Sequence, residues 1–122
     1  MGIKFTAAVA AFMTLLAAEA VHSEPVNNSQ QAIEYMIGYV ARSGATFIRN
    51  GKSYTANEAA AHLKSKYDYF KRDIATPEDF IRLAGSKSEL SGKPYQVQTQ
   101  DGHFVASADW LRQILTEYRI TR

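Results

Sequence analysis

Two glycine-containing turns limit the folds open to this chain of 122 residues. Asn50-Gly51 lies in the first half and Asp101-Gly102 in the second, each between short runs of β-branched and aromatic residues. Asn-Gly and Asp-Gly are the dipeptides that best tolerate the backbone of a tight hairpin turn. Because an isolated hairpin is barely stable in water, we expect the two hairpins, at 45–54 and 95–106, to join in one antiparallel sheet of about four strands.

Two helices are predicted in the first half of the chain. Four apolar residues share one helical face, which predicts a helix from about Gln30 to Ser43; they are Ile33, Met36, Ile37 and Val40. A second helix is predicted to start after Thr55, where Thr55 and Glu58 have the spacing of a capping box, and to run to about Arg72.

Two further helices are predicted in the second half. Thr76 followed by Pro77 combines a hydroxyl cap with a proline at the first helical position, which predicts a helix with Phe80, Ile81 and Ala84 on its buried side. Ser107 is predicted to cap the last helix, whose apolar stripe is Leu111, Ile114, Leu115 and Tyr118.

The sequence therefore predicts an α+β fold in which four helices pack on a small antiparallel sheet made of two β-hairpins, in the order α-ββ-α-α-ββ-α. The two halves also suggest an internal pseudo-repeat, since Thr55-Ala-Asn57 resembles Ser107-Ala-Asp109. The alternative is that the halves are unrelated, because the remaining residues differ.

The N-terminal residues have the pattern of a cleavable signal peptide. Lys4 gives a positive start, residues 5–18 carry no charge, and small residues allow cleavage after Ala20 or Ser23. The apolar run is shorter than the ~20 residues of a membrane-spanning helix, and no cysteine is present for lipid attachment. We expect a signal peptide at 1–23, a flexible tether at 24–29 and one domain at 30–122. The expected location is periplasmic, with secretion as the alternative and no membrane anchor after cleavage.

Composition argues against several classes of function. The formal charge of +2 is spread among acidic residues, unlike the clustered basic surface of a nucleic-acid-binding protein. The chain has no cysteine for a disulfide or a thiol nucleophile, and no G-x-S-x-G or S-x-x-K motif. If cleavage follows Ser23, His62 and His103 are the only histidines left, and no H-x-x-x-H spacing exists, so no metal site and no cofactor are predicted. No catalytic constellation is recognisable.

A row of polar residues on the second predicted helix is the first candidate site. His62, Lys66, Tyr69 and Asp73 are spaced four, three and four residues apart and share a strip beside the apolar face. An imidazole and an ammonium in one strip could bind an anion or move a proton. The structural alternative is a solvated edge of the core, with Lys66 lying over an aromatic ring.

Two more candidates lie outside this helix. The loop containing Ser91 and Lys93 is rich in hydroxyl groups and could bind phosphate, sulfate or a sugar, although Pro94 departs from the nucleotide-binding P-loop motif. Arg49 lies beside the first turn, where its guanidinium could bind a carboxylate. Purely structural roles, in turning the chain and holding a neighbouring loop, are the alternatives for both.

Several motifs resemble those of a known protein family. They are Phe47-Ile-Arg-Asn-Gly51, Glu58-Ala59, His62-Leu63, Lys66, Thr76, Glu78, Phe80-Ile81 and Ser91-Gly-Lys-Pro-Tyr95. In this order they resemble the YfeK-like family of small exported bacterial proteins, a domain of unknown function. The resemblance covers nearly all of the chain after the signal peptide. It implies export and no assigned activity, so no catalytic residue is transferred from it.

Three functions remain open at this level. The first is a non-catalytic interaction module that binds an unknown periplasmic protein through an exposed hairpin edge. The second is a binder of a small anionic or sugar ligand that uses Arg49, His62, Lys66 and Lys93, with Tyr69 and Ser91 nearby. The third is an enzyme with His62 as general base, which would require a carboxylate to orient the imidazole.

Overall fold

The computed structural model describes residues 26–122 of the chain. The elements follow in the order α2 (Val26–Arg42), β1 (Thr46–Arg49), β2 (Lys52–Tyr54), α3 (Ala56–Tyr69), the short 3₁₀ helix η1 (Lys71–Asp73), α4 (Pro77–Ala84), β3 (Gln96–Gln98), β4 (Phe104–Ala106) and α5 (Ser107–Thr121). The predicted α+β class and the order of helices and hairpins are confirmed. The predicted signal peptide lies outside the described residues.

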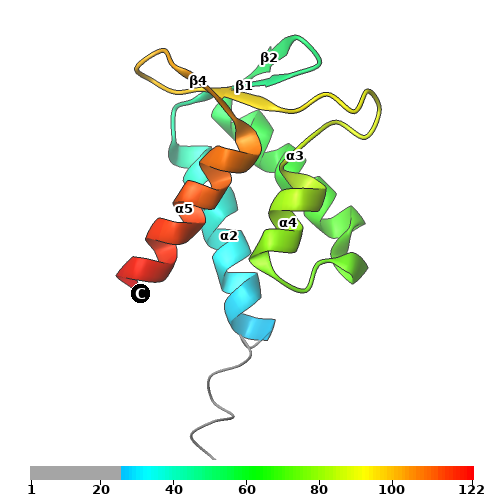
Figure 1. Ribbon diagram of the computed structural model, residues 1–122, viewed down its shortest axis with the longest axis vertical. Coiled ribbons are helices and arrows are strands. Elements are labelled where there is room, and N and C mark those ends of the chain that lie inside the picture. The colour runs from blue at the N-terminus through cyan, green and yellow to red at the C-terminus, as the bar shows by residue number, and fades with distance from the viewer. Residues whose placement is uncertain (1–25) are drawn as a thin grey trace, which may run out of the picture.

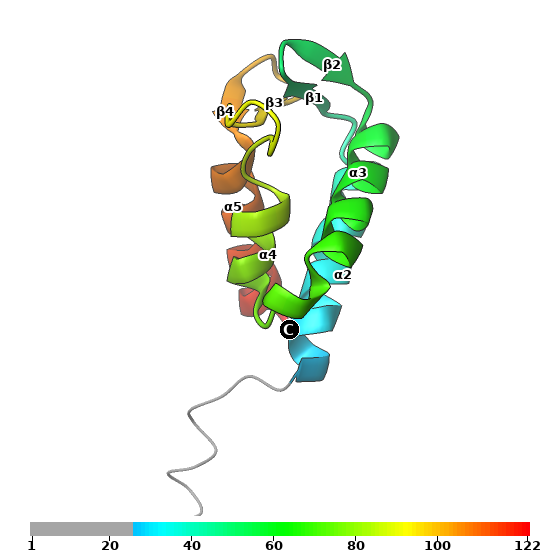
Figure 2. The ribbon, with the colours of Figure 1, turned by 90° about the vertical axis from the view of Figure 1, so that its right-hand side faces the viewer.

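The two hairpins form one four-stranded antiparallel sheet with the order β2-β1-β3-β4. The central pair joins the two halves of the chain, with Phe47 opposite Val97. Figures 1 and 2 show the sheet lying across one end of the four helices, with α2 and α3 on one side of the molecule and α4 and α5 on the other. The C-terminus lies at the helix ends remote from the sheet (Figure 1).

A single apolar core fills the space between these layers. Its largest fully buried side chains come from α2, α4, α5 and β3; they are Ile33, Met36, Val40, Pro77, Phe80, Ile81, Leu111 and Val97. The apolar stripes predicted for the first, third and fourth helices supply most of this set. Burial of each such side chain contributes roughly 1.5 to 3 kcal/mol, so the helical stripes hold the layers together. No helix within 26–122 is both long enough and apolar enough to cross a membrane.

The two hairpin turns differ in their backbone. Asn50 and Gly51 both have positive φ, of 52° and 78°, as a two-residue type I′ turn requires. In the second hairpin only Gly102 has positive φ, and its N–H donates to the carbonyl of Thr99 at 2.9 Å. The second turn is therefore a longer loop that closes between Thr99 and His103, whose backbone groups are bonded at 2.9 Å.

Two helix boundaries differ from the prediction. Helix α2 begins at Val26 instead of Gln30, so residues 26–29 of the predicted tether are helical. Helix α3 ends at Tyr69 instead of Arg72, because the chain tightens at Phe70 into η1 and turns back toward α4. The N–H of Phe70 still donates to the carbonyl of Lys66 at 2.9 Å, which completes the last turn of α3.

Helix caps explain where α3 and α4 begin. The hydroxyl of Thr55 accepts from the N–H of Glu58 at 3.1 Å, and the Glu58 carboxylate accepts from the N–H of Thr55 at 2.9 Å, which confirms the predicted capping box. Thr76 and Asp79 form a second such box at the start of α4.

The prediction that Ser107 caps α5 is wrong. The cap residue is Ala106, and Ser107 is the first residue of the helix. Strand β4 continues into α5 without a loop, so the N–H of Ser107 donates to the carbonyl of Tyr95 at 2.9 Å. This contact leaves the Ser107 side chain inside the protein, where the residue is only 2% exposed.

Candidate functional site

The structure brings three of the predicted site residues together around Tyr95. His62 and Lys66 lie four residues apart on α3, and Arg49 ends the neighbouring strand β1. Tyr95, which immediately precedes β3, is buried at 7% exposure and reaches α3 from the opposite side. A cluster of an imidazole, an ammonium, a guanidinium and a phenol therefore lies at the junction between α3 and the sheet.

Lys66 is fully engaged within the protein. Its Nζ donates to the carbonyl of Lys87 at 3.0 Å, to Oε2 of Glu89 at 3.1 Å and to Oη of Tyr95 at 3.2 Å. These three bonds use every donor of the ammonium group. Lys66 therefore fixes the loop after α4 against α3, and its charge is neutralised by Glu89 before any ligand binds. These contacts support the structural alternative for this residue.

His62 is held by a hydrogen bond to Tyr95. Its Nε2 lies 3.0 Å from Tyr95 Oη, and the two rings meet edge to face at 5.8 Å. Burial lowers the pKa of His62 below 6.5, and the positive charges of Arg49 and Lys66 lower it further. The imidazole is therefore neutral at pH 7. Since Lys66 already donates to the phenol oxygen, the phenol proton is free to bond to His62 Nε2.

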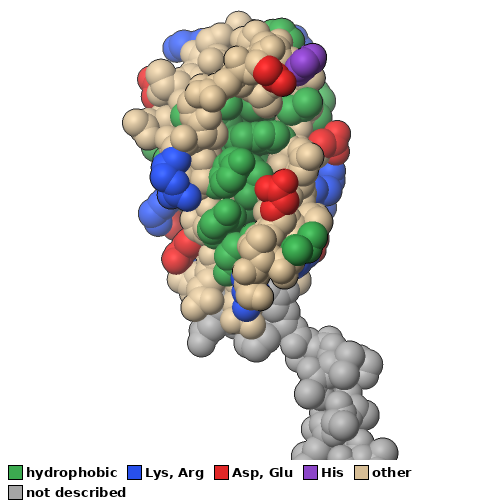
Figure 3. Space-filling view, turned by 90° about the vertical axis from the view of Figure 1, so that its left-hand side faces the viewer, with side chains coloured by type: hydrophobic (Ala, Val, Ile, Leu, Met, Phe, Trp, Pro, Cys, Tyr) green, Lys and Arg blue, Asp and Glu red, His purple; other side chains and the backbone are tan. Residues whose placement is uncertain are grey.

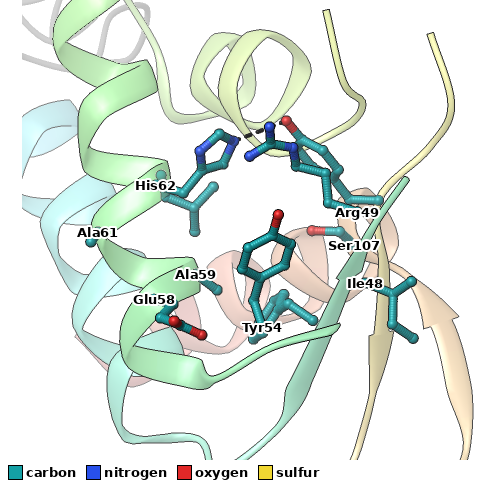
Figure 4. Close-up of a pocket in the computed structure, with 11 residues that line it drawn as sticks. Ile48, Arg49, Tyr54, Glu58, Ala59, Ala61, His62 and Ser107 are labelled. Atoms are coloured by element: carbon teal, nitrogen blue, oxygen red, sulfur yellow. Dashed lines mark hydrogen bonds between the residues drawn. The ribbon is translucent and has the colours of Figure 1, made fainter. Parts of the chain in front are cut away.

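A pocket of about 330 Å³ opens beside this cluster, between α3 and the hairpin β1–β2. Its wall is mostly apolar and includes Phe47, Ile48, Tyr54, Ala59, Leu63 and Tyr95. Its polar lining comes from Arg49, Glu58, His62 and Ser107. Figure 4 shows Arg49, Tyr54 and His62 converging on one space from the strands and from α3. We call this space the inner pocket.

Three polar groups in the inner pocket lack a partner among residues 26–122. No carboxylate of these residues forms an ion pair with Arg49, whose guanidinium lies 5.8 Å from the centre of the Tyr54 ring. The hydroxyls of Tyr54 and Ser107 make no hydrogen bond with the described residues either. Figure 4 shows both hydroxyls directed toward the pocket. No side-chain oxygen or nitrogen of the described residues is both fully buried and unpaired, so the two hydroxyls are accessible from the pocket, and all three groups can bind a ligand there.

A second, more open pocket of about 230 Å³ adjoins the first. Arg49, His62 and Tyr95 line both pockets and therefore mark their junction. The remaining lining of this outer pocket comes from α3 and the loop after α4; it consists of Lys66, Tyr69, Phe70, Ser88, Glu89 and Leu90. Two of these residues, Tyr69 and Leu90, are 82% and 90% exposed, so the outer pocket is a shallow entrance.

The other predicted site residues have separate positions. Ser91 donates its hydroxyl to the side-chain oxygen of Asn50 and so ties the loop to the first hairpin turn. Lys93 is exposed and lines neither pocket. Of the four donors in the predicted ligand site, Arg49, His62 and Lys66 converge and Lys93 does not. Asp73, the last residue of the polar row, is exposed in η1, where the helical spacing no longer applies.

Sequence reasoning missed three residues of the site: Tyr54, Tyr95 and Ser107. The alternation of side chains along each predicted strand indicates that its tyrosine is partly buried. It does not indicate which tyrosine hydroxyl contacts a polar side chain of α3. Ser107 has the sequence pattern of a helix cap, because it is a serine before an apolar stripe. A pocket formed by four separate elements leaves no local signal that would have placed these residues together.

Residues 26–122 contain no group of three or more His, Asp or Glu side chains that could hold a metal ion. The carboxylates near the site are already used. Glu58 belongs to the capping box of α3, and Glu89 accepts from Lys66. The site is therefore a set of hydrogen-bond donors beside an apolar wall.

Comparisons with known proteins give the chain a family. A family model described as "Family of unknown function (DUF5329)" matches residues 27–119. The chain is also similar to the "Uncharacterized protein YfeK" of Salmonella typhimurium strain LT2, with 36% identity over 94 residues that cover 75% of each protein. No solved structure matches the chain. The resemblance to YfeK-like proteins is confirmed, and the chain belongs to this family of unknown function (DUF5329).

Proposed function

We propose that this protein is a non-catalytic binder of a small anionic ligand, which it holds in the inner pocket. The observation that carries the proposal is the Arg49 guanidinium, which lies at the junction of the two pockets without an ion-pair partner among the described residues. An arginine fork pairs in two parallel hydrogen bonds with a carboxylate or phosphate group. The unpartnered hydroxyls of Tyr54 and Ser107 add two further donors to the same space.

A binding role accounts for the hydrogen bonding of His62 better than a catalytic role does. A general base of the usual kind is oriented by a carboxylate, whereas the ring of His62 bonds to the phenol of Tyr95. Within residues 26–122 neither an Asp nor a Glu bonds to this ring. Lys66 is equally unsuited to act on a substrate, because its three donors are occupied. Both residues serve to shape the pocket.

The proposal is tested by thermal shift and calorimetry of the protein from residue 24 onward, with phenylacetate, phenyl phosphate and phenyl sulfate as probes. A ligand at 100 times its dissociation constant raises the free energy of unfolding by ~2.7 kcal/mol. We expect at least one probe to bind, and Arg49→Gln to abolish that binding. Arg112→Gln is the matched control, since Arg112 bonds to Asp109 on the exposed side of α5 and should leave binding unchanged. A panel without binding, or binding that survives Arg49→Gln, would exclude the proposal.

We further infer that the protein acts in the periplasm after removal of residues 1–23. The support is the sequence pattern alone: Lys4, the uncharged run at 5–18 and the small residues at Ala20 and Ser23. Cell fractionation with intact-mass measurement tests it. The expected product is periplasmic and begins at Val21 or Glu24, and a cytoplasmic, uncleaved product would contradict the inference.

An interaction module is the second candidate function, and the observation that favours it is the free edge of β4. Among residues 26–122 this strand pairs only with β3, while Phe104 and Val105 are 57% and 37% exposed. Figure 3 shows a hydrophobic strip on this face of the molecule. Helices α2 and α5 also contact each other through aromatic rings, with the ring centres of Tyr35 and Tyr118 4.6 Å apart. An extended apolar segment of a partner could pair with β4 and cover this strip.

A photo-crosslinking residue placed at Phe104 tests this second candidate in cells. A discrete partner adduct at Phe104, absent when the same residue replaces the exposed Arg112 on the outer side of α5, is the expected result. Equal labelling at both positions would contradict a specific role for the β4 edge.

A further inference from the structure

The residues that line the inner pocket indicate a narrower class of ligand than small anions in general. We infer that the ligand is a monocarboxylate with a compact apolar body: the carboxylate pairs with Arg49 at the junction of the two pockets, and the apolar body lies against Phe47 and Leu63. This inference rests on the proposed function, since it describes the same site.

The distribution of charge around the pocket favours a single negative charge. Glu89 neutralises Lys66, and His62 is uncharged at pH 7, so Arg49 is the one lining cation without an ion-pair partner in the described residues. Glu58, which also lines the pocket, is exposed, and Figure 4 shows it across the pocket from Arg49. A dianion such as a phosphate monoester would have one charge uncompensated in this space and would be repelled by Glu58. A carboxylate matches the single guanidinium.

The hydrogen-bonding groups of the lining favour a ligand that accepts hydrogen bonds. Arg49 can only donate, and the hydroxyls of Tyr54 and Ser107 are free to donate because no described residue accepts their protons. Ser107 is 2% exposed as a residue, and no side-chain oxygen or nitrogen of the described residues is both fully buried and unpaired, so the small exposed part of Ser107 includes its hydroxyl, which faces the pocket. Among the described residues Glu58 is the one carboxylate that lines the inner pocket, and one of its two oxygens already accepts from the N–H of Thr55.

The shape and wall of the pocket favour a small apolar body. About 330 Å³ is at the lower end of the range for small-molecule sites. Most of its lining is apolar and includes the aromatic and aliphatic side chains of Phe47, Tyr54 and Leu63. A free sugar would place hydroxyls against these side chains without partners, which costs binding energy. A phenyl ring or a short alkyl chain fits the wall without that cost.

Three probes with the same apolar body test the charge requirement: phenylacetate, 2-phenylacetamide and benzylphosphonate, measured by calorimetry at pH 8. They carry one negative charge, no charge and up to two negative charges. We expect phenylacetate to bind at least tenfold more tightly than either of the others, since a tenfold change corresponds to the loss of one charge-assisted contact. Arg49→Gln should remove this preference for phenylacetate over the amide.

The possible failures of the two proposals are distinguishable. If benzylphosphonate binds as tightly as phenylacetate and both depend on Arg49, the monocarboxylate inference is wrong while the anion-binding function stands. If the neutral amide binds as tightly as phenylacetate, or if none of the three binds and phenyl phosphate and phenyl sulfate also fail, both proposals are wrong.

The two free hydroxyls provide an independent measurement. Ser107→Ala and Tyr54→Phe should each weaken phenylacetate binding by about three- to tenfold, as the loss of one hydrogen bond does. Neither should lower the thermal midpoint of the ligand-free protein, because neither hydroxyl bonds to a described residue. Unchanged affinity in both variants would overturn the inference that the carboxylate of the ligand reaches these hydroxyls.

Discussion

Nε2 of His62 and Oη of Tyr95 lie 3.0 Å apart, and their hydrogen bond joins α3 to the residue that precedes β3. The same phenol oxygen accepts from Lys66, so one hydroxyl orients two side chains of α3. The bond therefore fixes the positions of two residues that line both the inner and the outer pocket. It also connects the second half of the chain, through Tyr95, to the site.

Removing the Tyr95 hydroxyl should destabilise the protein. In Tyr95→Phe, buried Lys66 loses one acceptor and His62 loses its partner, and an unsatisfied group of this kind costs about 1 to 3 kcal/mol. Tyr54→Phe is the matched control, expected to change stability by less than ~0.5 kcal/mol because that hydroxyl has no protein partner among the described residues. Urea unfolding measures both. Equal losses in the two variants would contradict a structural role for the Tyr95 hydroxyl.

The free energy of unfolding should depend on pH through His62. The folded pKa lies below the unfolded value of 6.5, so the unfolded chain binds more protons in the window between the two. Stability therefore rises with pH across this window and is fully present above about 6.5. Urea unfolding between pH 5.5 and 8, above the range in which the lowered pKa values of Glu78 and Asp79 affect stability, should show this slope in the wild type and in the control His103→Gln. The slope should be absent in His62→Gln, and its persistence there would assign it to another group.

Two glycine substitutions should have opposite effects. Gly38 lies inside α2, where alanine would meet only the flexible end of Arg42, so Gly38→Ala should stabilise the protein by about 0.5 to 1 kcal/mol. At Gly85 an added Cβ would clash with a methyl group of the fully buried Leu111. Gly85→Ala should cost about 1 to 3 kcal/mol through overpacking. Thermal unfolding tests the pair, and a stable Gly85→Ala protein would show that α4 and α5 can move apart.

The two capping threonines should each contribute to stability. Thr55→Ala and Thr76→Ala remove the hydroxyls that accept from Glu58 and Asp79, at a cost of about 1 kcal/mol each. Thr116→Ala, inside α5 on an exposed face, is the control and should be neutral or slightly stabilising because alanine favours helix. Circular dichroism during urea unfolding gives all three values. A Thr116→Ala loss as large as the other two would remove the capping explanation.

The site was only partly predictable, and Lys66 shows why. Its position on a polar strip of α3 follows from spacing, and so does its placement over an aromatic ring at the edge of the core. Its acceptors on Lys87, Glu89 and Tyr95 are more than twenty positions away and depend on how the loop after α4 folds back. Lys93, a second lysine of the predicted site, lies in that loop, is exposed and lines neither pocket. The spacing of residues along the chain does not predict this difference between Lys66 and Lys93.

The sequence by itself determined the local features: the two hairpins, the capping boxes at Thr55 and Thr76, and the apolar stripes that became the core. These follow from backbone preferences and from the 3.6-residue helical period, which act over a few neighbouring residues. The tertiary structure alone decided that β1 pairs with β3, that Ser107 is buried beside a pocket instead of capping a helix, and that Arg49 lies without an acid beside it among the described residues. Those outcomes depend on contacts between distant segments, whose geometry is set when all the layers pack at once.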